Sequence, residues 1–419
     1  MTSPPTERFR IAFVDDEQHI LRGISRALAD MEDEWDMTFC ASGAEALAQA
    51  RQKPFDVVVS DMRMPGMDGA QLLAEIRRLY PATARVILSG YADSDAVLRT
   101  VGPAHIYLAK PCDAETLLRA IRRQASLRAL LRSPSLRATL AGLANLPSLP
   151  DVYARLQAEL LSPDSAAKGV AEIIAQDVAM TAELLKLTNS AYFTATGGVA
   201  SPLQAVRLLG VEVIQALVLK AGVFRQYSGR EDLAPLLEAL TGHGLALSSL
   251  AERVAVVEGA DPATARAAQI AAMLADIGRV VLIDAHPDAY RSMLAGLAEG
   301  RPLHQAEQAA FGASHGLIGA YLLGLWGFAD PIVEAVAYAS EPSACPGRDN
   351  MVLTALHAAK ALGPPLSVGG APGADTVLDM TYLIEARHDG HVPRWRDLAR
   401  GGGALGDGNA EGRCPNGFC

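Results

Sequence analysis

Three carboxylates stand directly after two apolar runs of the sequence, where they could bind a cation together. Asp15 and Asp16 follow the run Phe9–Val14, and Asp61 follows the run 55–60. If these runs are neighbouring strands of a parallel sheet, the carboxylates converge at one edge and repel one another unless a cation neutralises them. Mg²⁺ is suitable, because it prefers oxygen ligands and keeps waters or phosphate oxygens in its shell. From these residues alone, helix capping by Asp15 and Asp16 remains an equal alternative.

A hydroxyl and an ammonium group follow two further apolar runs. Ser89 follows the run Arg85–Leu88, and Lys110 follows the run His105–Ala109. With a carboxylate acceptor and a metal ion, they form a set suited to a phosphoryl group, because metal and lysine neutralise its oxygens and the hydroxyl donates a hydrogen bond. The residues therefore predict a phosphoryl site at one edge of a sheet.

A doubly wound α/β domain would bring these side chains together. From residue 9 to about 132, short apolar runs alternate with amphipathic stretches of helical period, which predicts a parallel sheet with helices on both faces. Right-handed crossovers restrict how the strands can be connected. The expected strands are 9–14, 37–40, 55–60, 85–88 and 105–109, and the expected helices are 20–28, 44–52, 72–80, 93–101 and a last one after Pro111.

Residues 9–127 resemble the receiver domain of bacterial two-component response regulators. Four segments carry the similarity in order and spacing: Val14–Asp16, Ser60–Gly69, Leu88–Gly90 and Ala109–Pro111. The resemblance implies a five-stranded parallel sheet of strand order 2-1-3-4-5. It also implies that Asp61 accepts phosphate from a sensor histidine kinase.

The resemblance further assigns a metal site beside Asp61. It implies that Mg²⁺ is bound by Asp16, Asp61 and the backbone carbonyl of Arg63, and that Asp15 assists through a water molecule.

A switch is implied in the same way. Ser89 and Lys110 would contact the phosphoryl group, and Tyr107 stands at the position of the family's switch aromatic residue. Phosphorylation adds about 1.5 to 2 negative charges. Ser89 would then move towards the new oxygens and Tyr107 would turn inward, which would reshape the surface of the last helices and strands.

The pattern changes after an Arg-rich stretch that contains Ser133 and Pro134. We expect a receiver domain at 8–127, a linker at 128–139 and a helical domain at 140–340, because helical periods replace the alternation. A helical extension to about 400 would complete this domain, with Trp395 as a packing anchor. The Gly-rich segment 401–419 has few large apolar residues and is expected to be disordered.

The helical part only partly matches the metal ligands of HD-class phosphohydrolases, which are a His, a His-Asp pair and an Asp. His243 and Asp276 could be two of them, but Ala275 stands at the expected His and Lys360 at the last expected Asp. We therefore expect no enzyme activity, and structural roles for His243, Asp276 and His315. A receiver-controlled, metal-dependent phosphohydrolase, for example one acting on a cyclic dinucleotide, is the alternative.

Residues from about 140 to 340 resemble instead the HDOD family, an HD-related domain of bacterial signalling proteins that is generally regarded as non-catalytic. The supporting segments are 146–150, 173–177, 184–192, 205–210 and 319–327. The resemblance implies an output through contact with a downstream protein, which the sequence does not identify. A turn at Asn189–Ala191 could hold a small ligand, although we favour a simple helix end.

Charge and apolar runs argue against other classes of function. The net charge of −10, and the lack of a recognition-helix pattern after the linker, argue against DNA binding. The weakly polar run 317–329 is shorter than the ~20 residues of a membrane span and predicts a buried core helix. Residues 1–10 lack the apolar core of an export signal, so we expect a cytoplasmic protein.

Cysteines and arginines give weaker signals. The five cysteines are odd in number and scattered, so no disulfide framework is expected, and Cys414 and Cys419 alone cannot complete a zinc site. The Arg-rich stretch 119–132 is expected to be a solvated helix face, with a homodimer contact as the alternative.

Overall fold

The computed structural model describes residues 8–90, 104–130, 136, 140, 146–148, 150–162, 165–188, 199–219, 225–226, 234–297, 301–347, 349–368, 371–372 and 376–400. The helix expected at 93–101, most of the linker, the turn at 189–191 and the tail with Cys414 and Cys419 lie outside these residues. Within the described ranges, no helix has both the length and the apolar character that a membrane crossing requires.

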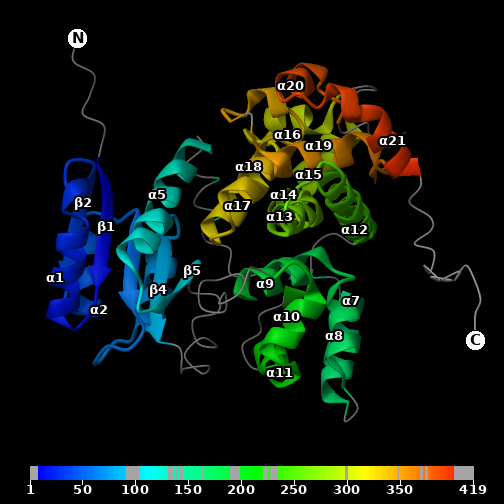
Figure 1. Ribbon diagram of the computed structural model, residues 1–419. Coiled ribbons are helices and arrows are strands. Elements are labelled where there is room, and N and C mark those ends of the chain that lie inside the picture. The colour runs from blue at the N-terminus through cyan, green and yellow to red at the C-terminus, as the bar shows by residue number, and fades with distance from the viewer. Residues whose placement is uncertain are drawn as a thin grey trace, which may run out of the picture.

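The N-terminal domain is a parallel sheet of five strands in the order β2-β1-β3-β4-β5, which confirms the predicted topology (Figure 1). The strands are β1 Phe9–Val14, β2 Trp35–Cys40, β3 Val57–Asp61, β4 Ala84–Gly90 and β5 Ile106–Lys110. The described helices of this domain are α1 Gln18–Ala27, η1 Ala29–Met31, α2 Gly43–Gln52, α3 Gly69–Leu79 and α5 Ala114–Leu130.

The two faces of the sheet are buried in separate apolar cores, because side chains alternate along each strand. Val58 and Ile87 face a core that includes side chains of α2 and α3. Val57 and Val59 face the opposite core, which continues through α5 into the second domain. All five residues of β3 are buried, which explains why its sequence is almost continuously apolar up to Ser60.

Helix α3 begins where the chain passes closest to the end of β3. Asp68 caps this helix by accepting a hydrogen bond from the backbone N–H of Gln71, and the Gln71 side chain accepts one from the Asp68 backbone in return. A Cβ atom on Gly69 would lie 2.2 Å from the carbonyl oxygen of Asp61, so only glycine fits here. The capped helix start therefore presses directly against the strand end that carries Asp61.

The second domain is mainly helical, as predicted. Its helices are α7 Pro150–Leu161, α8 Ala167–Ile174, α9 Val178–Thr188, α10 Pro202–Leu209, α11 Val211–Leu219, α12 Ala234–Val257, α13 Pro262–Met273, α14 Ile277–Ala285, α15 Pro287–Ala295, α16 Leu303–Phe311, α17 His315–Leu325, α18 Asp330–Tyr338, η3 Pro342–Ala344, α19 Met351–Leu362, α20 Met380–Glu385, η4 Asp389–His391 and α21 Val392–Arg400. Two short strand pairs were not expected from the sequence: β6 Pro147–Ser148 with β7 Arg225–Gln226, and β8 Ser367–Val368 with β9 Ala371–Pro372.

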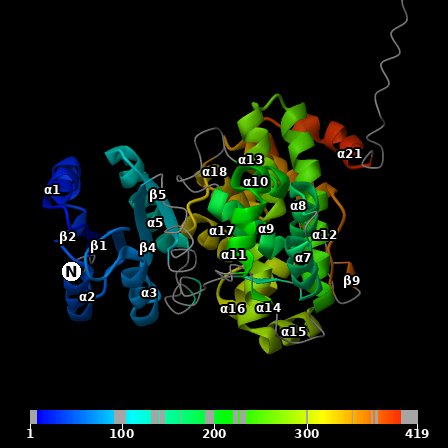
Figure 2. The ribbon, with the colours of Figure 1, turned by 90° about the horizontal axis from the view of Figure 1, so that it is seen from below.

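These helices form two groups that pack on each other. Figures 1 and 2 show α7 to α11 gathered on one side of the longer bundle made by α12, α13, α14, α17, α18 and α19. Helix α17 begins two residues before the run 317–329 that was expected to be a buried core helix, and it is buried at every position except Leu317. Trp395 of α21 is completely buried, in agreement with its expected role as a packing anchor.

Helix α5 joins the two domains by packing against α17 (Figure 1). Leu127 lies against Gly324 so closely that a Cβ atom at Gly324 would come within 2.5 Å of its side chain. Gln124 donates a hydrogen bond to the Gly324 carbonyl at 3.4 Å, and Arg123 forms a 2.7 Å ion pair with Asp330. One face of the Arg-rich stretch is therefore a contact surface between domains.

Candidate functional site

The parallel register aligns the strand ends that carry the predicted phosphoryl site. Val14 pairs with Ser60, Asp61 pairs with Leu88, and Gly90 pairs with Lys110. These pairings bring the ends of β1, β3, β4 and β5 to one edge of the sheet, as expected for a doubly wound domain.

Lys110 lies between two carboxylates at this edge. Its Nζ atom is 2.9 Å from Asp15 Oδ2 and 2.5 Å from Asp61 Oδ1. Burial opposes the charge on this ammonium, but the two carboxylates outweigh burial and raise the pKa of Lys110. Lys110 is therefore charged at neutral pH and neutralises part of the negative charge of the site.

Backbone amides hold the other oxygen of each carboxylate. Asp15 Oδ1 accepts a hydrogen bond from the Glu17 backbone N–H at 2.9 Å, and Asp61 Oδ2 accepts one from the Arg63 backbone N–H at 2.8 Å. Both carboxylates are therefore fixed in orientation, and only a small part of the Asp61 side chain is exposed.

The remaining predicted residues lie next to this group. Asp16 is exposed at the end of β1, and Ser89 is buried near the end of β4, paired in register with Ala109. Tyr107 is buried on the same sheet face as Ile87, in the core that includes α2 and α3. The structure thus places Asp15, Asp61 and Lys110 in direct contact. Of the others, Asp16 lies just after β1, Arg63 just after β3, Ser89 in β4 and Tyr107 in β5.

The donor set at this edge fits Mg²⁺. The candidate donors are all oxygens: the carboxylates of Asp16 and Asp61, the backbone carbonyl of Arg63, and the Asp15 carboxylate beside them. Asp15 and Asp61 are buried next to each other and share one ammonium, so further positive charge would be favourable there.

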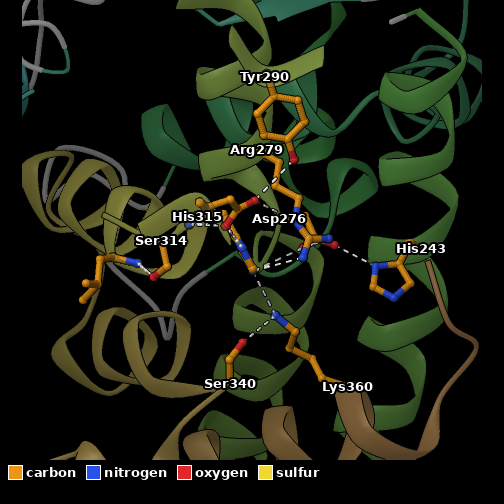
Figure 3. A network of polar contacts seen from close by, with 10 residues as sticks. His243, Asp276, Arg279, Tyr290, Ser314, His315, Ser340 and Lys360 are labelled. Carbon is orange, nitrogen blue, oxygen red and sulfur yellow. Dashed lines mark hydrogen bonds and ion pairs between the residues drawn. The ribbon is translucent and has the colours of Figure 1, made fainter. Parts of the chain in front are cut away.

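A second polar cluster is buried inside the helical domain (Figure 3). Asp276, just before α14, accepts a 2.7 Å hydrogen bond from His243 Nδ1 of α12 and lies 3.1 Å from Arg279 Nη1. Burial of Asp276 favours its neutral form, but Arg279 and His243 outweigh burial and hold the pKa of this carboxyl well below its usual range. Asp276 is therefore ionised at neutral pH and paired with a cation of the protein itself.

Glu307 and His315 continue this cluster from α16 and α17. His315 Nδ1 lies 2.5 Å from Glu307 Oε2, and Glu307 Oε1 lies 3.6 Å from Arg279 Nε. On its other side, His315 Nε2 lies 3.2 Å from the ammonium of Lys360, which also bonds Ser340 at 3.5 Å (Figure 3). Burial, and then the charge of Arg279, lower the pKa of His315, so its imidazole is neutral at pH 7.

The comparison of the sequence with HD-type metal ligands identified part of this cluster but not Arg279 and Glu307 at its centre. His243 and Asp276 do contact each other, whereas Lys360 contacts His315. Arg279 and Glu307, both fully buried, were missed. A charged residue inside the apolar helix 277–285 was the available signal for Arg279, because a buried charge requires a partner.

Two domain families match the chain. Residues 11–122 match the response regulator receiver domain, and residues 146–342 match the HDOD domain. The chain is a response regulator in which a receiver domain is followed by an HDOD domain.

Among the particular relatives, the hydrogenase transcriptional regulatory protein HoxA of Cupriavidus necator is 32% identical over 115 residues, which is 27% of this chain and 23% of HoxA. A response regulator receiver protein of Anaeromyxobacter sp. is 38% identical over 88 residues, 21% of this chain and 36% of that protein. The DNA-binding transcriptional regulator NtrC of Escherichia coli is 36% identical over 114 residues, 27% of this chain and 24% of NtrC. The chain thus spans about a quarter to a third of the length of these relatives.

Two solved structures are also similar. The MmoQ response regulator of Methylococcus capsulatus aligns with 60% of this chain and 98% of its own, at 23% identity and a TM-score of 0.41. The receiver domain of an HD domain-containing protein from Pseudomonas fluorescens aligns with 30% of this chain and 97% of its own, at 31% identity and a TM-score of 0.28.

Proposed function

We propose that this response regulator is a cytoplasmic phosphoprotein in which Asp61 accepts a phosphoryl group from a sensor histidine kinase. Its HDOD domain then acts without catalysis, by binding a downstream protein. The contact of Lys110 with both Asp15 and Asp61 is the observation that carries the first part of this proposal.

In the transfer step, a carboxylate oxygen of Asp61 forms a bond to phosphorus while the bond from phosphorus to the histidine nitrogen of the kinase breaks, and that nitrogen keeps the electron pair. Lys110 exchanges its contact with Asp61 Oδ1 for a contact with a phosphoryl oxygen, and Ser89 supplies a hydrogen bond from β4. Asp16, Asp61 and the Arg63 carbonyl would hold Mg²⁺, which would supply positive charge for the phosphoryl oxygens.

The signal leaves the receiver through β5 and α5. Tyr107 is buried in β5 and its neighbour Ile106 faces the opposite side, where its side chain comes within 3.8 Å of the Cβ position of Gly327, just after α17. A change in the position of Tyr107 would therefore alter the contact between β5, α5 and α17. This contact is the element that phosphorylation would shift.

The buried cluster of the HDOD domain supports a non-catalytic output. Metal-dependent hydrolysis needs carboxylates and imidazoles that are open to a metal and to water. Here Arg279 lies between Asp276 and Glu307, and Lys360 contacts Nε2 of His315. These two cations would repel a metal ion from Asp276, Glu307 and His315, which supports the proposal of a non-catalytic domain.

Labelling with a small phosphodonor tests the acceptor. Wild type incubated with acetyl phosphate and Mg²⁺ should gain one phosphoryl group by intact mass. Asp61→Asn should gain none, whereas Asp36→Asn, which changes a half-exposed carboxylate away from the site, should label as wild type does. Labelling of Asp61→Asn would place the acceptor elsewhere.

The output is tested by metal analysis and by a hydrolysis assay. We expect no transition metal to be held by His243 and Asp276, and no turnover of cyclic dinucleotides. Turnover that is lost in Asp276→Asn would favour the metal-dependent phosphohydrolase instead.

A further inference from the structure

A group of metal-binding side chains lies on the helical domain, outside the cluster around Arg279. Glu258 directly follows the long helix α12, and His388 and His391 lie before and within the 3-10 helix η4. Their ligand atoms lie within 4.8 Å of one another. Glu258 Oε2 is 2.5 Å from His391 Nδ1 and 3.2 Å from His388 Nδ1.

A tryptophan orients the carboxylate of this group. Trp395 of α21 donates a hydrogen bond from Nε1 to Glu258 Oε1 at 2.8 Å, which leaves Oε2 directed at the two imidazoles. The Glu258 side chain is only 3% exposed. A carboxylate that ligates a metal ion is usually oriented by such a hydrogen bond to its other oxygen.

His388 gives a second, independent indication that this group binds an ion. Its Nδ1 atom is buried and makes no hydrogen bond to the described residues, although it lies only 3.2 Å from Glu258 Oε2. The geometry therefore does not allow a satisfactory hydrogen bond between the two groups. A cation between Nδ1 and Oε2 would satisfy both lone pairs.

We propose that Glu258, His388 and His391 bind a divalent transition metal ion, with zinc as the preferred ion, and that this ion fastens the C-terminal helices α20 and α21 to the end of α12. Two imidazoles and one carboxylate are a frequent ligand set of zinc. The two histidines are three residues apart across a 3-10 turn, which places them on one side of the chain.

The separations of the three ligand atoms suit a zinc ion once the His391 side chain shifts outward. Ligand atoms about 2.1 Å from a tetrahedral zinc ion are about 3.4 Å apart. The 3.2 Å separation of Glu258 Oε2 and His388 Nδ1 is already close to this value, whereas His391 Nδ1, now 2.5 Å from Glu258 Oε2, would have to move outward by about 0.9 Å. His391 is free to do so, because its side chain is 51% exposed. The same exposure leaves a fourth coordination position open to water.

The first experiment measures zinc content. The tag-free full chain, with Cys414 and Cys419 changed to serine so that thiols cannot bind, is stripped with EDTA, loaded with ZnCl₂, desalted and analysed by mass spectrometry for metals. This parent protein should retain one more zinc ion per chain than its Glu258→Gln or His391→Gln variant. Glutamine at 258 keeps an acceptor for Trp395, so the fold is preserved while the charged ligand is lost.

The second experiment measures thermal unfolding, with His304→Gln as the matched control. His304 also contacts a carboxylate, Glu341 at 3.1 Å, but that pair is not part of the three-ligand group. Zinc at 100 times its dissociation constant should raise the unfolding temperature of the parent and of His304→Gln by about 5–10 °C, and that of the Glu258 and His391 variants by much less. Equal zinc contents or equal shifts in all variants would overturn the proposal.

Discussion

Lys110 is the residue on which the charge balance of the receiver site depends. Its ammonium contacts Asp15 and Asp61, each of which also accepts one backbone hydrogen bond. Without the ammonium, two adjacent carboxylates with little exposure would repel each other. The sequence predicted the convergence of these three residues, because each stands at or just after a strand that could be recognised.

Replacing Lys110 with glutamine should therefore destabilise the receiver domain and make its stability depend on Mg²⁺. We expect a loss of about 1–3 kcal/mol in the free energy of unfolding at pH 7, less than for a fully buried pair because Lys110 is partly exposed. Millimolar Mg²⁺ should restore more stability to Lys110→Gln than to wild type in urea unfolding. An equal effect of Mg²⁺ on both proteins would contradict this charge balance.

The buried histidines of the HDOD domain predict a loss of stability in mild acid. Burial lowers the pKa of both His315 and His357. The unfolded chain, with histidine pKa values near 6.5, takes up protons that the folded chain does not. Stability should thus be complete above about pH 7 and fall below pH 6.5, by up to about 1.4 kcal/mol per pH unit for each histidine.

Urea unfolding at pH 7.5, 6.5 and 5.5 measures this dependence. His357→Gln should reduce its steepness, because one buried imidazole is removed, whereas the exposed His19→Gln should leave it unchanged. A slope that is the same in all three proteins would show that other groups control it.

At the scale of elements, the contact between α5 and α17 depends on a glycine in α17. Gly324 lets Leu127 approach the backbone of α17, and the Gln124 side chain bonds the Gly324 carbonyl. A Cβ atom at this position would come within 2.5 Å of the Leu127 side chain. The two helices would have to separate or Leu127 would have to change its rotamer.

Gly324→Ala should therefore loosen the two domains from each other. We expect faster hydrogen exchange in α5 and α17, and a loss of about 1–3 kcal/mol in stability. Gly23→Ala is the matched control, because nothing lies within 4 Å of its Cβ position in α1. Unchanged exchange at α5 in Gly324→Ala would argue against a tight contact.

The sequence located the strands of the receiver well, but for the HDOD domain it predicted only that the elements are mainly helices. Apolar runs located the five strands to within about two residues, although Asp61 proved to be the last residue of β3. Helical periodicity could not show which helices pair, because apolar faces of similar pattern fit many partners. The pairing of Arg279 with Glu307 depends on that packing, so the sequence alone did not reveal it.

At the scale of the whole molecule, one apolar core runs from the receiver sheet through α5 into the helical bundle. From this continuity we expect the two domains to move together. A charge change at Asp61 should therefore alter the helical domain and not only the receiver.

Phosphorylation should change hydrogen exchange on both sides of the domain contact. With acetyl phosphate and Mg²⁺, we expect altered exchange in β5, α5 and α17 of wild type. Asp61→Asn should show no change under the same conditions. Changes confined to the loops around Asp61 would mean that the signal leaves by another route.

If the HDOD domain is non-catalytic, as we propose, its ion cluster also limits how readily a hydrolase could be made from this protein. Installing Ala275→His and Lys360→Asp would supply two ligands, yet the guanidinium of Arg279 would still fill the space between Asp276 and Glu307. Removing Arg279 alone would leave two buried carboxylates without their cation, at a severe cost in stability. Each single substitution on the way is therefore unfavourable, and gain of metal-dependent activity would require several of them at once.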